Sequence, residues 1–162
     1  MRLLIAEDEL WLRKRLVSTI DWSSYGISEV YEAEDGGEAL EIALKEKPDI
    51  VITDIRMPGL NGLELIEKVR EISPDIKIMI ISGYANFEYA QNALKQGVSD
   101  YLLKPINKDA LNESLTKMVN QIETARRTDM AFQDIQNERR EELIKLRNMP
   151  VSYTHLRAHE TL

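Results

Sequence analysis

The sequence predicts an α/β protein built on a doubly wound, five-stranded parallel sheet. Short apolar runs alternate with longer segments of helical spacing, and five such strand–helix units follow one another along the chain. Several of the apolar runs contain almost no polar residue, as expected of strands that helices cover on both faces. The 162 residues, 43% of them hydrophobic, give room for one such domain and an appendage.

The expected strands are short and bounded by polar residues. They cover residues 3–6, 29–33, 50–53, 76–81 and 101–103. The first, third and fourth are nearly all apolar, whereas the second is mixed, which favours an edge position for it.

A helix is expected after each strand. The helical segments cover residues 9–20, 37–47, 63–72, 87–96, and 107 onward. Gly97 stands where a helix stop is expected, and Pro48 and Pro74 end two other helices.

The last helix is expected to continue beyond the domain. Five apolar residues recur there at alternating spacings of four and three, namely Leu111, Leu115, Met118, Ile122 and Ala125. The first three favour packing onto the sheet, while a dimer-forming coiled coil beyond Ile122 is an open alternative. Because residues 126–147 are densely and oppositely charged, we expect a domain over residues 1–122 and a charged helical linker over residues 123–149.

The final stretch, residues 150–162, does not continue the periodicity of the linker. It looks like a translated sequencing adapter, so we expect a non-native tail, with the true C-terminus lost. His155 and His159 lie in this stretch, and their spacing of four is not expected to form a metal site.

Composition restricts the classes of function. Without cysteine there is no disulfide framework, thiolate metal site or cysteine nucleophile. The net charge of -7 argues against nucleic acid as a direct partner, because phosphate binding requires clustered Lys and Arg. No signal peptide is evident and no apolar run approaches the roughly 18 residues of a membrane span, so we expect a cytoplasmic protein without a membrane partner.

Polar residues stand at the ends of four expected strands. Glu7 and Asp8 follow the first strand, Asp54 the third, Ser82 the fourth and Lys104 the fifth. Because ligands bind at the carboxyl ends of the strands in such sheets, these side chains are expected to converge on one site. Each has an ordinary explanation alone, such as a helix cap for Asp8 or a turn for Asp54. Their agreement over four strands favours a functional site.

The chemistry of these residues indicates phosphoryl transfer. Clustered carboxylates repel one another unless a cation compensates, and oxygen ligands without His or Cys favour Mg²⁺. A carboxylate beside Mg²⁺ can accept a phosphoryl group when the charge on the transferring oxygens is neutralised. Lys104 supplies a second cation for these oxygens and Ser82 a hydrogen bond, while the backbone carbonyl of Arg56 is well placed to bind the metal.

The pattern resembles the receiver domains of bacterial two-component response regulators over about residues 1–122. The matching residues are Glu7-Asp8, Asp54 followed by Met57-Pro58-Gly59-Leu60-Asn61-Gly62, Ser82-Gly83, and Tyr101 three residues before Lys104-Pro105. Glu7 replaces a more common aspartate, and threonine is also frequent at the position of Ser82. Both residues keep the required chemistry.

The resemblance implies a flavodoxin-like fold and a phosphoacceptor site. Asp54 would take a phosphoryl group from a phosphohistidine of a sensor histidine kinase in a Mg²⁺-dependent step. Glu7, Asp8 and the carbonyl of Arg56 would hold the metal with Asp54, while Lys104 and Ser82 contact the phosphoryl group. Such a domain catalyses only its own phosphorylation and dephosphorylation.

The resemblance also implies a conformational switch. Ser82 would move toward the phosphoryl group and Tyr101 would turn inward behind it, reshaping the face made by the fourth helix, the fifth strand and the fifth helix. A cis peptide bond between Lys104 and Pro105 is usual in this family.

The run of residues 82–90 looks like the receivers that precede AraC-type helix-turn-helix output domains, and the charged linker agrees. DNA binding is therefore expected only through an output domain that is missing here, and a homodimer through the last helix and the linker stays open.

One alternative function is that of a stand-alone receiver that acts by docking proteins, and the presence of the linker counts against it. Another is a phosphatase of the haloacid-dehalogenase type, which requires an acid where this chain has Arg56. A nucleotide-binding protein is set aside, because neither a phosphate-cradling loop nor a Gly-rich dinucleotide turn is present.

Overall fold

The computed structural model describes residues 1–83 and 86–148 of the chain. The expected tail at residues 150–162, with His155 and His159, lies outside the described residues. The chain forms two units, Met1–Gln121 and Ile122–Leu162, and each is treated by itself.

The first unit contains a five-stranded sheet with the strand order β2-β1-β3-β4-β5. The strands are β1 (Arg2–Ala6), β2 (Glu29–Ala33), β3 (Ile50–Thr53), β4 (Lys77–Ser82) and β5 (Asp100–Leu103). Every neighbouring pair is parallel. The predicted parallel sheet is therefore confirmed, and β2 lies at an edge as its mixed sequence indicated.

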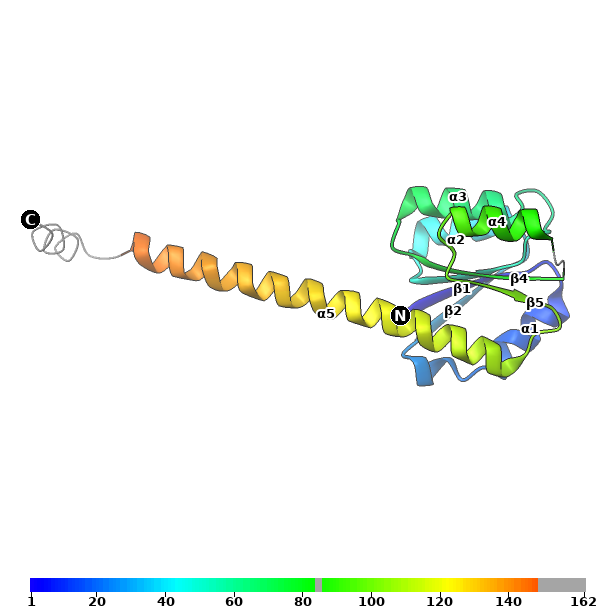
Figure 1. Ribbon diagram of the computed structural model, residues 1–162, viewed down its shortest axis with the longest axis horizontal. Helices are drawn as coiled ribbons and strands as arrows, with labels where there is room; N and C mark the ends of the chain where they lie inside the picture. The colour runs from blue at the N-terminus through cyan, green and yellow to red at the C-terminus, as the bar shows by residue number, and fades with distance from the viewer. Residues whose placement is uncertain (84–85, 149–162) are drawn as a thin grey trace, which may run out of the picture. The chain divides into compact units, whose positions relative to one another are not determined.

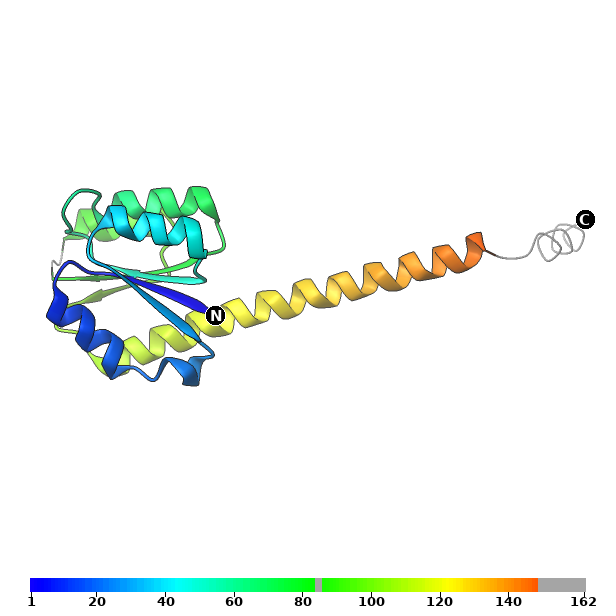
Figure 2. The ribbon, with the colours of Figure 1, turned by 180° about the vertical axis from the view of Figure 1, so that it is seen from behind.

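Helices cover both faces of this sheet. They are α1 (Leu10–Thr19), α2 (Gly36–Glu46), α3 (Gly62–Ile72), α4 (Phe87–Lys95) and α5 (Lys108–Arg147). Figure 1 shows α2, α3 and α4 on one face, and α1 with the first turns of α5 on the other; the view from behind in Figure 2 agrees. A short 3-10 helix, η1 (Trp22–Tyr25), follows α1 and was not predicted.

Side-chain caps determine where several helices begin. Asp35, Asn61, Asn86 and Asn107 each accept hydrogen bonds from backbone N–H groups in the first turn of the helix that follows. The predicted stop at Gly97 is also confirmed: α4 ends at Lys95, and Gly97 has a φ of 74°, a left-handed conformation that glycine adopts readily. Caps thus mark where α2, α3, α4 and α5 begin, and Gly97 marks where α4 ends.

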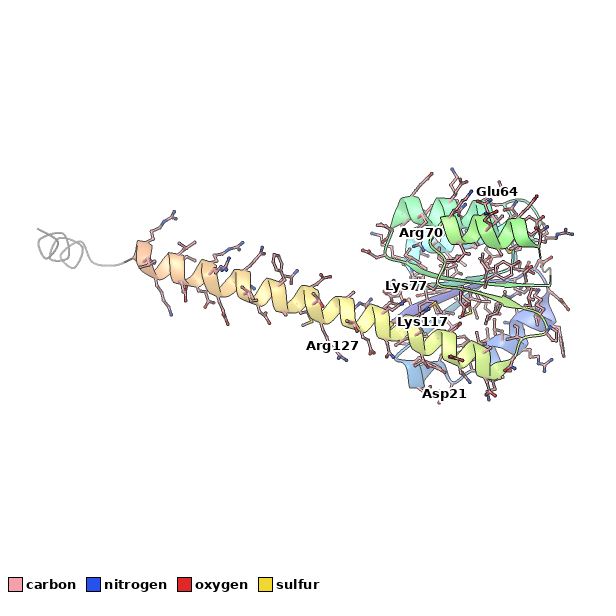
Figure 3. All side chains as sticks on the ribbon, viewed as in Figure 1. Asp21, Glu64, Arg70, Lys77, Lys117 and Arg127 are labelled. Atoms are coloured by element: carbon pink, nitrogen blue, oxygen red, sulfur yellow. The ribbon has the colours of Figure 1, made fainter. Side chains whose placement is uncertain are left out.

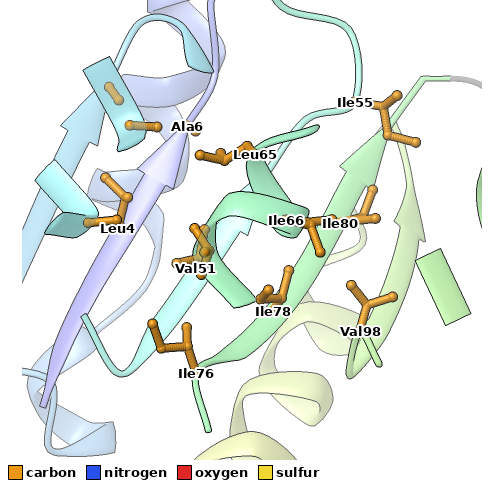
Figure 4. Close-up of a cluster of buried hydrophobic side chains, with 14 of the residues drawn as sticks. Leu4, Ala6, Val51, Ile55, Leu65, Ile66, Ile76, Ile78, Ile80 and Val98 are labelled. Carbon is orange, nitrogen blue, oxygen red and sulfur yellow. The ribbon is translucent and has the colours of Figure 1, made fainter. Parts of the chain in front are cut away.

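The strands supply apolar side chains alternately to the two faces of the sheet. Leu4, Val51, Ile78 and Ile80 belong to the core under α2, α3 and α4 (Figure 4). The intervening residues Leu3, Ile5, Ile50, Ile52, Met79 and Ile81 are also buried, and so are three residues of the predicted heptad stripe: Leu111, Leu115 and Met118. This packing holds the strand ends, and hence the residues that follow them, in fixed positions.

The second unit contains the rest of α5. Large apolar side chains are exposed along it, and they are Met130, Phe132, Ile135, Leu143, Ile144 and Leu146. Glu123 and Arg127 form an exposed ion pair one turn apart, with 3.9 Å between Oε2 and Nη2. Among the described residues, no helix has the length and apolar character needed to cross a bilayer.

Candidate functional site

Three acids meet at the carboxyl edge of the sheet. Glu7 and Asp8 follow β1 and Asp54 follows β3, the neighbouring strand in which Thr53 pairs with Ala6. One carboxylate oxygen from each acid lies within 4.8 Å of those of the others. Glu7 and Asp54 are buried, at 6% and 7% exposure, whereas Asp8 is exposed. The structure thus brings together the acids that the strand ends predicted.

Asp54 is held in one orientation. Its backbone N–H donates to the carbonyl of Ala6 at 3.0 Å, which continues the ladder between β1 and β3. Its Oδ1 accepts from the N–H of Ile55 at 2.7 Å, and its Oδ2 accepts from Nζ of Lys104, also at 2.7 Å. The carboxylate of Asp54 therefore has a fixed direction at the end of the central strand.

Lys104 is the cation of the site and reaches it from β5. Its Nζ donates to Oε1 of Glu7 at 3.0 Å as well as to Asp54, and its backbone N–H donates to the carbonyl of Ser82 at 2.8 Å. The peptide bond between Lys104 and Pro105 is cis, as expected. One ammonium group thus joins two of the three acids.

The charges in this site are unbalanced. Burial raises the pKa of Glu7 to about 7, with Asp54 acting in the same direction and Lys104 against it. Burial alone would lower the pKa of Lys104, but its hydrogen bonds with Asp54 and Glu7 outweigh this and raise it. The candidate metal ligands of the acidic cluster are all carboxylate oxygens, which suit a hard divalent cation such as Mg²⁺.

Asp8 does not serve as a helix cap. The N-cap position of α1 is occupied by Glu9, and α1 begins at Leu10. The carboxylate of Asp8 instead lies within the acidic cluster with Glu7 and Asp54. The ordinary explanation of this residue as a cap therefore does not apply.

The other predicted site residues lie close by in the fold. Ser82 ends β4 and is fully buried, and Tyr101 on β5 is half-buried against the core under α4. Arg56 stands two residues after Asp54 with an exposed side chain. Their roles as phosphoryl contact, switch and carbonyl ligand stay predictions.

Two residues of the site were missed in the sequence. At Gly62, an added Cβ would lie 2.0 Å from the carbonyl oxygen of Asp54, so only glycine allows α3 to start against the Asp54 peptide. Arg13 on α1 donates from Nη1 to the carbonyl of Glu7 at 2.7 Å. Gly62 belongs to the run that carries the family resemblance, but the sequence alone indicates no structural role for it. No pattern in the sequence indicates Arg13.

Comparison with protein families decides what this arrangement is. The response regulator receiver domain matches residues 3–116 of the chain. The chain belongs to this family. It is accordingly a receiver domain of two-component signalling, which argues against the alternative of a dehalogenase-type phosphatase.

Relatives of this receiver domain include transcriptional regulatory proteins. YesN of Bacillus subtilis, an uncharacterized transcriptional regulatory protein, is 41% identical over 121 residues, covering 75% of this chain and 33% of YesN. The transcriptional regulatory protein HptR of Staphylococcus aureus is 37% identical over 118 residues, covering 73% of this chain and 46% of HptR. The chain therefore spans between a third and about half of these relatives.

Solved structures confirm the receiver fold. The receiver domain of AraT, a response regulator from Geobacillus stearothermophilus, matches with a TM-score of 0.73 and 40% identity, covering 77% of this chain and 97% of that one. A two-component transcriptional regulator AraC from Clostridium phytofermentans matches with a TM-score of 0.71 and 32% identity, covering 76% of this chain and 96% of that one. The fold predicted from the strand pattern is thus shared with receivers of regulators.

Proposed function

We propose that Asp54 accepts a phosphoryl group from a phosphohistidine of a sensor histidine kinase, in a step that depends on Mg²⁺. The observation that carries this proposal is the setting of the Asp54 carboxylate. It follows the central strand, lies 2.7 Å from the ammonium of Lys104, and shares a cluster with two further acids. A nucleophilic carboxylate with cationic neighbours suits a phosphoryl acceptor.

In the transfer, an oxygen of Asp54 forms a bond to phosphorus as the bond from phosphorus to the imidazole nitrogen breaks, and that nitrogen takes up a proton from solvent. The phosphoryl oxygens bring negative charge to a site that already holds two buried acids. Lys104 is placed to pair with one of these oxygens, because its Nζ already bonds to Asp54. The hydroxyl of Ser82, at the end of the neighbouring strand β4, would donate to another.

The carboxylates of Glu7, Asp8 and Asp54 would hold Mg²⁺, together with the backbone carbonyl of Arg56. When bound, the ion neutralises the charge of the acids and of the transferring oxygens. The acids fit this role because their oxygens already lie within 4.8 Å of one another.

Phosphorylation would be read out on the face made by α4, β5 and the first turns of α5. Ser82 and Tyr101 connect the site to this face, because they lie on the adjacent strands β4 and β5. In the intact protein, we expect this change to control a DNA-binding output domain of the AraC type. Support comes from the regulators of similar sequence, of which this chain spans less than half.

The linker of residues 123–149 would join such subunits as a coiled coil. The heptad stripe continues from Ile122 through Phe132 and Leu143 to Leu146, and the last three side chains are exposed. Polar residues interrupt the stripe between them, at Asp129, Gln136 and Arg139. We therefore expect a weak homodimer. In sedimentation equilibrium, the dimer mass should appear only at high protein concentration. A monomer at every concentration would contradict it.

The proposal is tested by intact mass spectrometry after incubation with phosphoramidate and Mg²⁺. The native chain should gain one phosphoryl group that hydroxylamine removes, and EDTA should prevent the gain. Asp54→Ala should gain none, whereas the control Asp49→Ala, at the other end of the sheet, should be modified like the native chain. A folded native chain without an adduct would contradict phosphoacceptor function.

A further inference from the structure

A buried arginine lies directly behind the acidic cluster. Arg13 on α1 is 4% exposed, and its Nη1 donates to the backbone carbonyl of Glu7 at 2.7 Å. Its Nε donates to Oε1 of Glu32 on β2 at 3.1 Å, and its Nη2 lies 3.8 Å from Oε1 of Glu34. A guanidinium group buried in this way is costly unless it is fully paired, so its position is closely determined by these partners.

The carbonyl that Arg13 binds belongs to the peptide that joins Glu7 to Asp8. On its other side, the backbone of Glu7 is held by its N–H, which donates to the carbonyl of Ala33 on β2 at 3.0 Å. Both carboxylates project from this short piece of backbone. The orientation of the peptide therefore determines whether the two carboxylates face Asp54.

The second partner of Arg13 is itself held in place. Glu32 accepts from Arg13 through Oε1 and from Nζ of Lys14 through Oε2 at 2.9 Å. Burial would raise the pKa of Glu32, but the hydrogen bonds from Lys14 and Arg13 outweigh it and lower the pKa. Glu32 thus stays ionised and anchors the guanidinium.

We propose that Arg13 is a positioning residue for metal binding, which fixes the Glu7–Asp8 peptide so that both carboxylates face Asp54 before the ion binds. The inference rests on the proposed function, because it assigns a role in binding Mg²⁺. Groups that orient metal ligands commonly change metal affinity by about 10- to 100-fold when they are removed. Arg13 touches only the backbone of the ligands, so its effect is on their orientation.

The sign of the effect separates orientation from simple electrostatics. Arg13 is a cation bonded to the backbone of Glu7, and by charge alone its removal should make the site more negative and strengthen the binding of Mg²⁺. If Arg13 orients the ligands, its removal should weaken binding instead. The two explanations therefore predict changes in opposite directions.

Arg70 offers a matched control at the other end of the sheet. This guanidinium is partly buried and, like that of Arg13, donates to the backbone: Nε to the carbonyl of Gln96 at 3.1 Å, Nη2 to that of Gly97 at 2.8 Å, and Nη1 to those of Pro74 and Ile76. Figure 3 shows Arg70 and Lys77 on the side of the domain where the strands begin, and Lys77 is the first residue of β4. A variant of Arg70 therefore reports the cost of losing such a residue without touching the metal ligands.

The experiment compares the native chain with Arg13→Met, Arg70→Met and Glu32→Gln. The Mg²⁺ dissociation constant is measured by isothermal titration calorimetry, and stability by urea unfolding in EDTA. For Arg13→Met we expect binding to weaken about 10-fold or more, with the rate of phosphoramidate labelling restored at saturating Mg²⁺. Arg70→Met should lose stability and bind Mg²⁺ like the native chain, and Glu32→Gln should weaken binding less than Arg13→Met.

The outcomes keep the two proposals distinct. If the native chain bound no Mg²⁺, the proposed function would fail and the inference with it. If the native chain bound Mg²⁺ and a folded Arg13→Met bound it equally or more tightly, only the inference would be overturned. Should Arg13→Met not fold, Glu32→Gln decides the question, because Glu32 is partly exposed and native affinity in that variant would also overturn the inference.

Discussion

The two ends of the sheet both gather charged residues, but they do so differently. At the amino end, Arg2 lies 3.7 Å from the carboxylates of both Glu29 and Glu46, and its N–H donates to Asp49 at 2.8 Å; Arg2 and Glu29 are exposed there. At the carboxyl end, Glu7 and Asp54 are buried and share the single ammonium of Lys104. Charges are thus solvated and paired at one end, and buried and unbalanced at the other.

The charges at the amino end are compatible with folding, whereas those at the carboxyl end oppose folding and are explained by function. Exposed ion pairs contribute little free energy and do not oppose folding, whereas clustered buried carboxylates oppose it until a cation neutralises them. Equivalent substitutions at the two ends should therefore have different effects, and in one case effects of opposite sign.

The largest effect is expected from Lys104→Met. Removing the ammonium leaves the phosphoryl oxygens without their protein cation, so labelling by phosphoramidate at saturating Mg²⁺ should slow by about 100-fold or more. Mg²⁺ itself should bind at least as tightly as to the native chain, because a competing cation is gone. The control is Lys77→Met at the start of β4, which should label normally. Weaker Mg²⁺ binding in Lys104→Met would mean that Lys104 does not compete with the ion, and it would contradict the electrostatic difference between the two ends of the sheet.

Gly62→Ala should have the next largest effect. The new Cβ would lie 2.0 Å from the carbonyl oxygen of Asp54 and 2.8 Å from Cα of Ile55, so α3 or the Asp54 peptide must shift. We expect a loss of about 3 kcal/mol in the free energy of unfolding and slower labelling of Asp54. Gly37→Ala in α2 meets only the carboxylate of Asp35, at 3.4 Å, and should gain up to about 1 kcal/mol in the free energy of unfolding. Urea unfolding of both variants checks this, and equal stabilities would contradict it.

The sequence predicted the regular part of the fold well, because strand and helix periods depend on local patterns. The strands at residues 29–33 and 50–53 were predicted with the bounds that the structure has. The 3-10 helix η1 was missed in part because one of its contacts comes from a residue far away in the sequence. The indole of Trp22 donates to the carbonyl of Val17 at 2.9 Å, and the hydroxyl of Tyr25 donates to Asn112, 87 residues away, at 2.7 Å.

The candidate site was likewise predictable only in part: the residues at the strand ends were predicted, but those that act through the backbone were not. Topology alone brings the ends of parallel strands together, so the meeting of Glu7, Asp54 and Lys104 followed from their places after strands. Arg13 and Gly62 act through the backbone of these acids, by donating to a carbonyl and by leaving room for one. Such roles depend on close approach in three dimensions, which residue type and spacing do not reveal.

Glu7→Gln should stabilise the metal-free chain. Burial raises the pKa of Glu7 from its ordinary 4.5 to about 7, so the folded state loses stability as the pH rises from 4.5 through 7 and the carboxylate ionises. Glutamine keeps an acceptor for Lys104 without this charge. At pH 8 in EDTA, the free energy of unfolding of the variant should be about 1 to 3 kcal/mol higher than that of the native chain. Adding Mg²⁺ should raise the free energy of unfolding of the native chain by a similar amount. If the variant were less stable than the native chain in EDTA, the charge on Glu7 would not oppose folding.

Glu46→Gln is the counterpart at the amino end and should have the smallest effect. Its carboxylate accepts from the hydroxyl of Tyr31 at 3.1 Å and lies 3.7 Å from Nη1 of Arg2. Glutamine keeps an acceptor for Tyr31 but loses the partly exposed ion pair, so stability in urea should fall by no more than about 1 kcal/mol, and salt should reduce the difference. Mg²⁺ affinity should not change. A gain in stability, as expected for Glu7→Gln, would mean that the carboxylates at both ends oppose folding and that the acidic site has no special electrostatic cost.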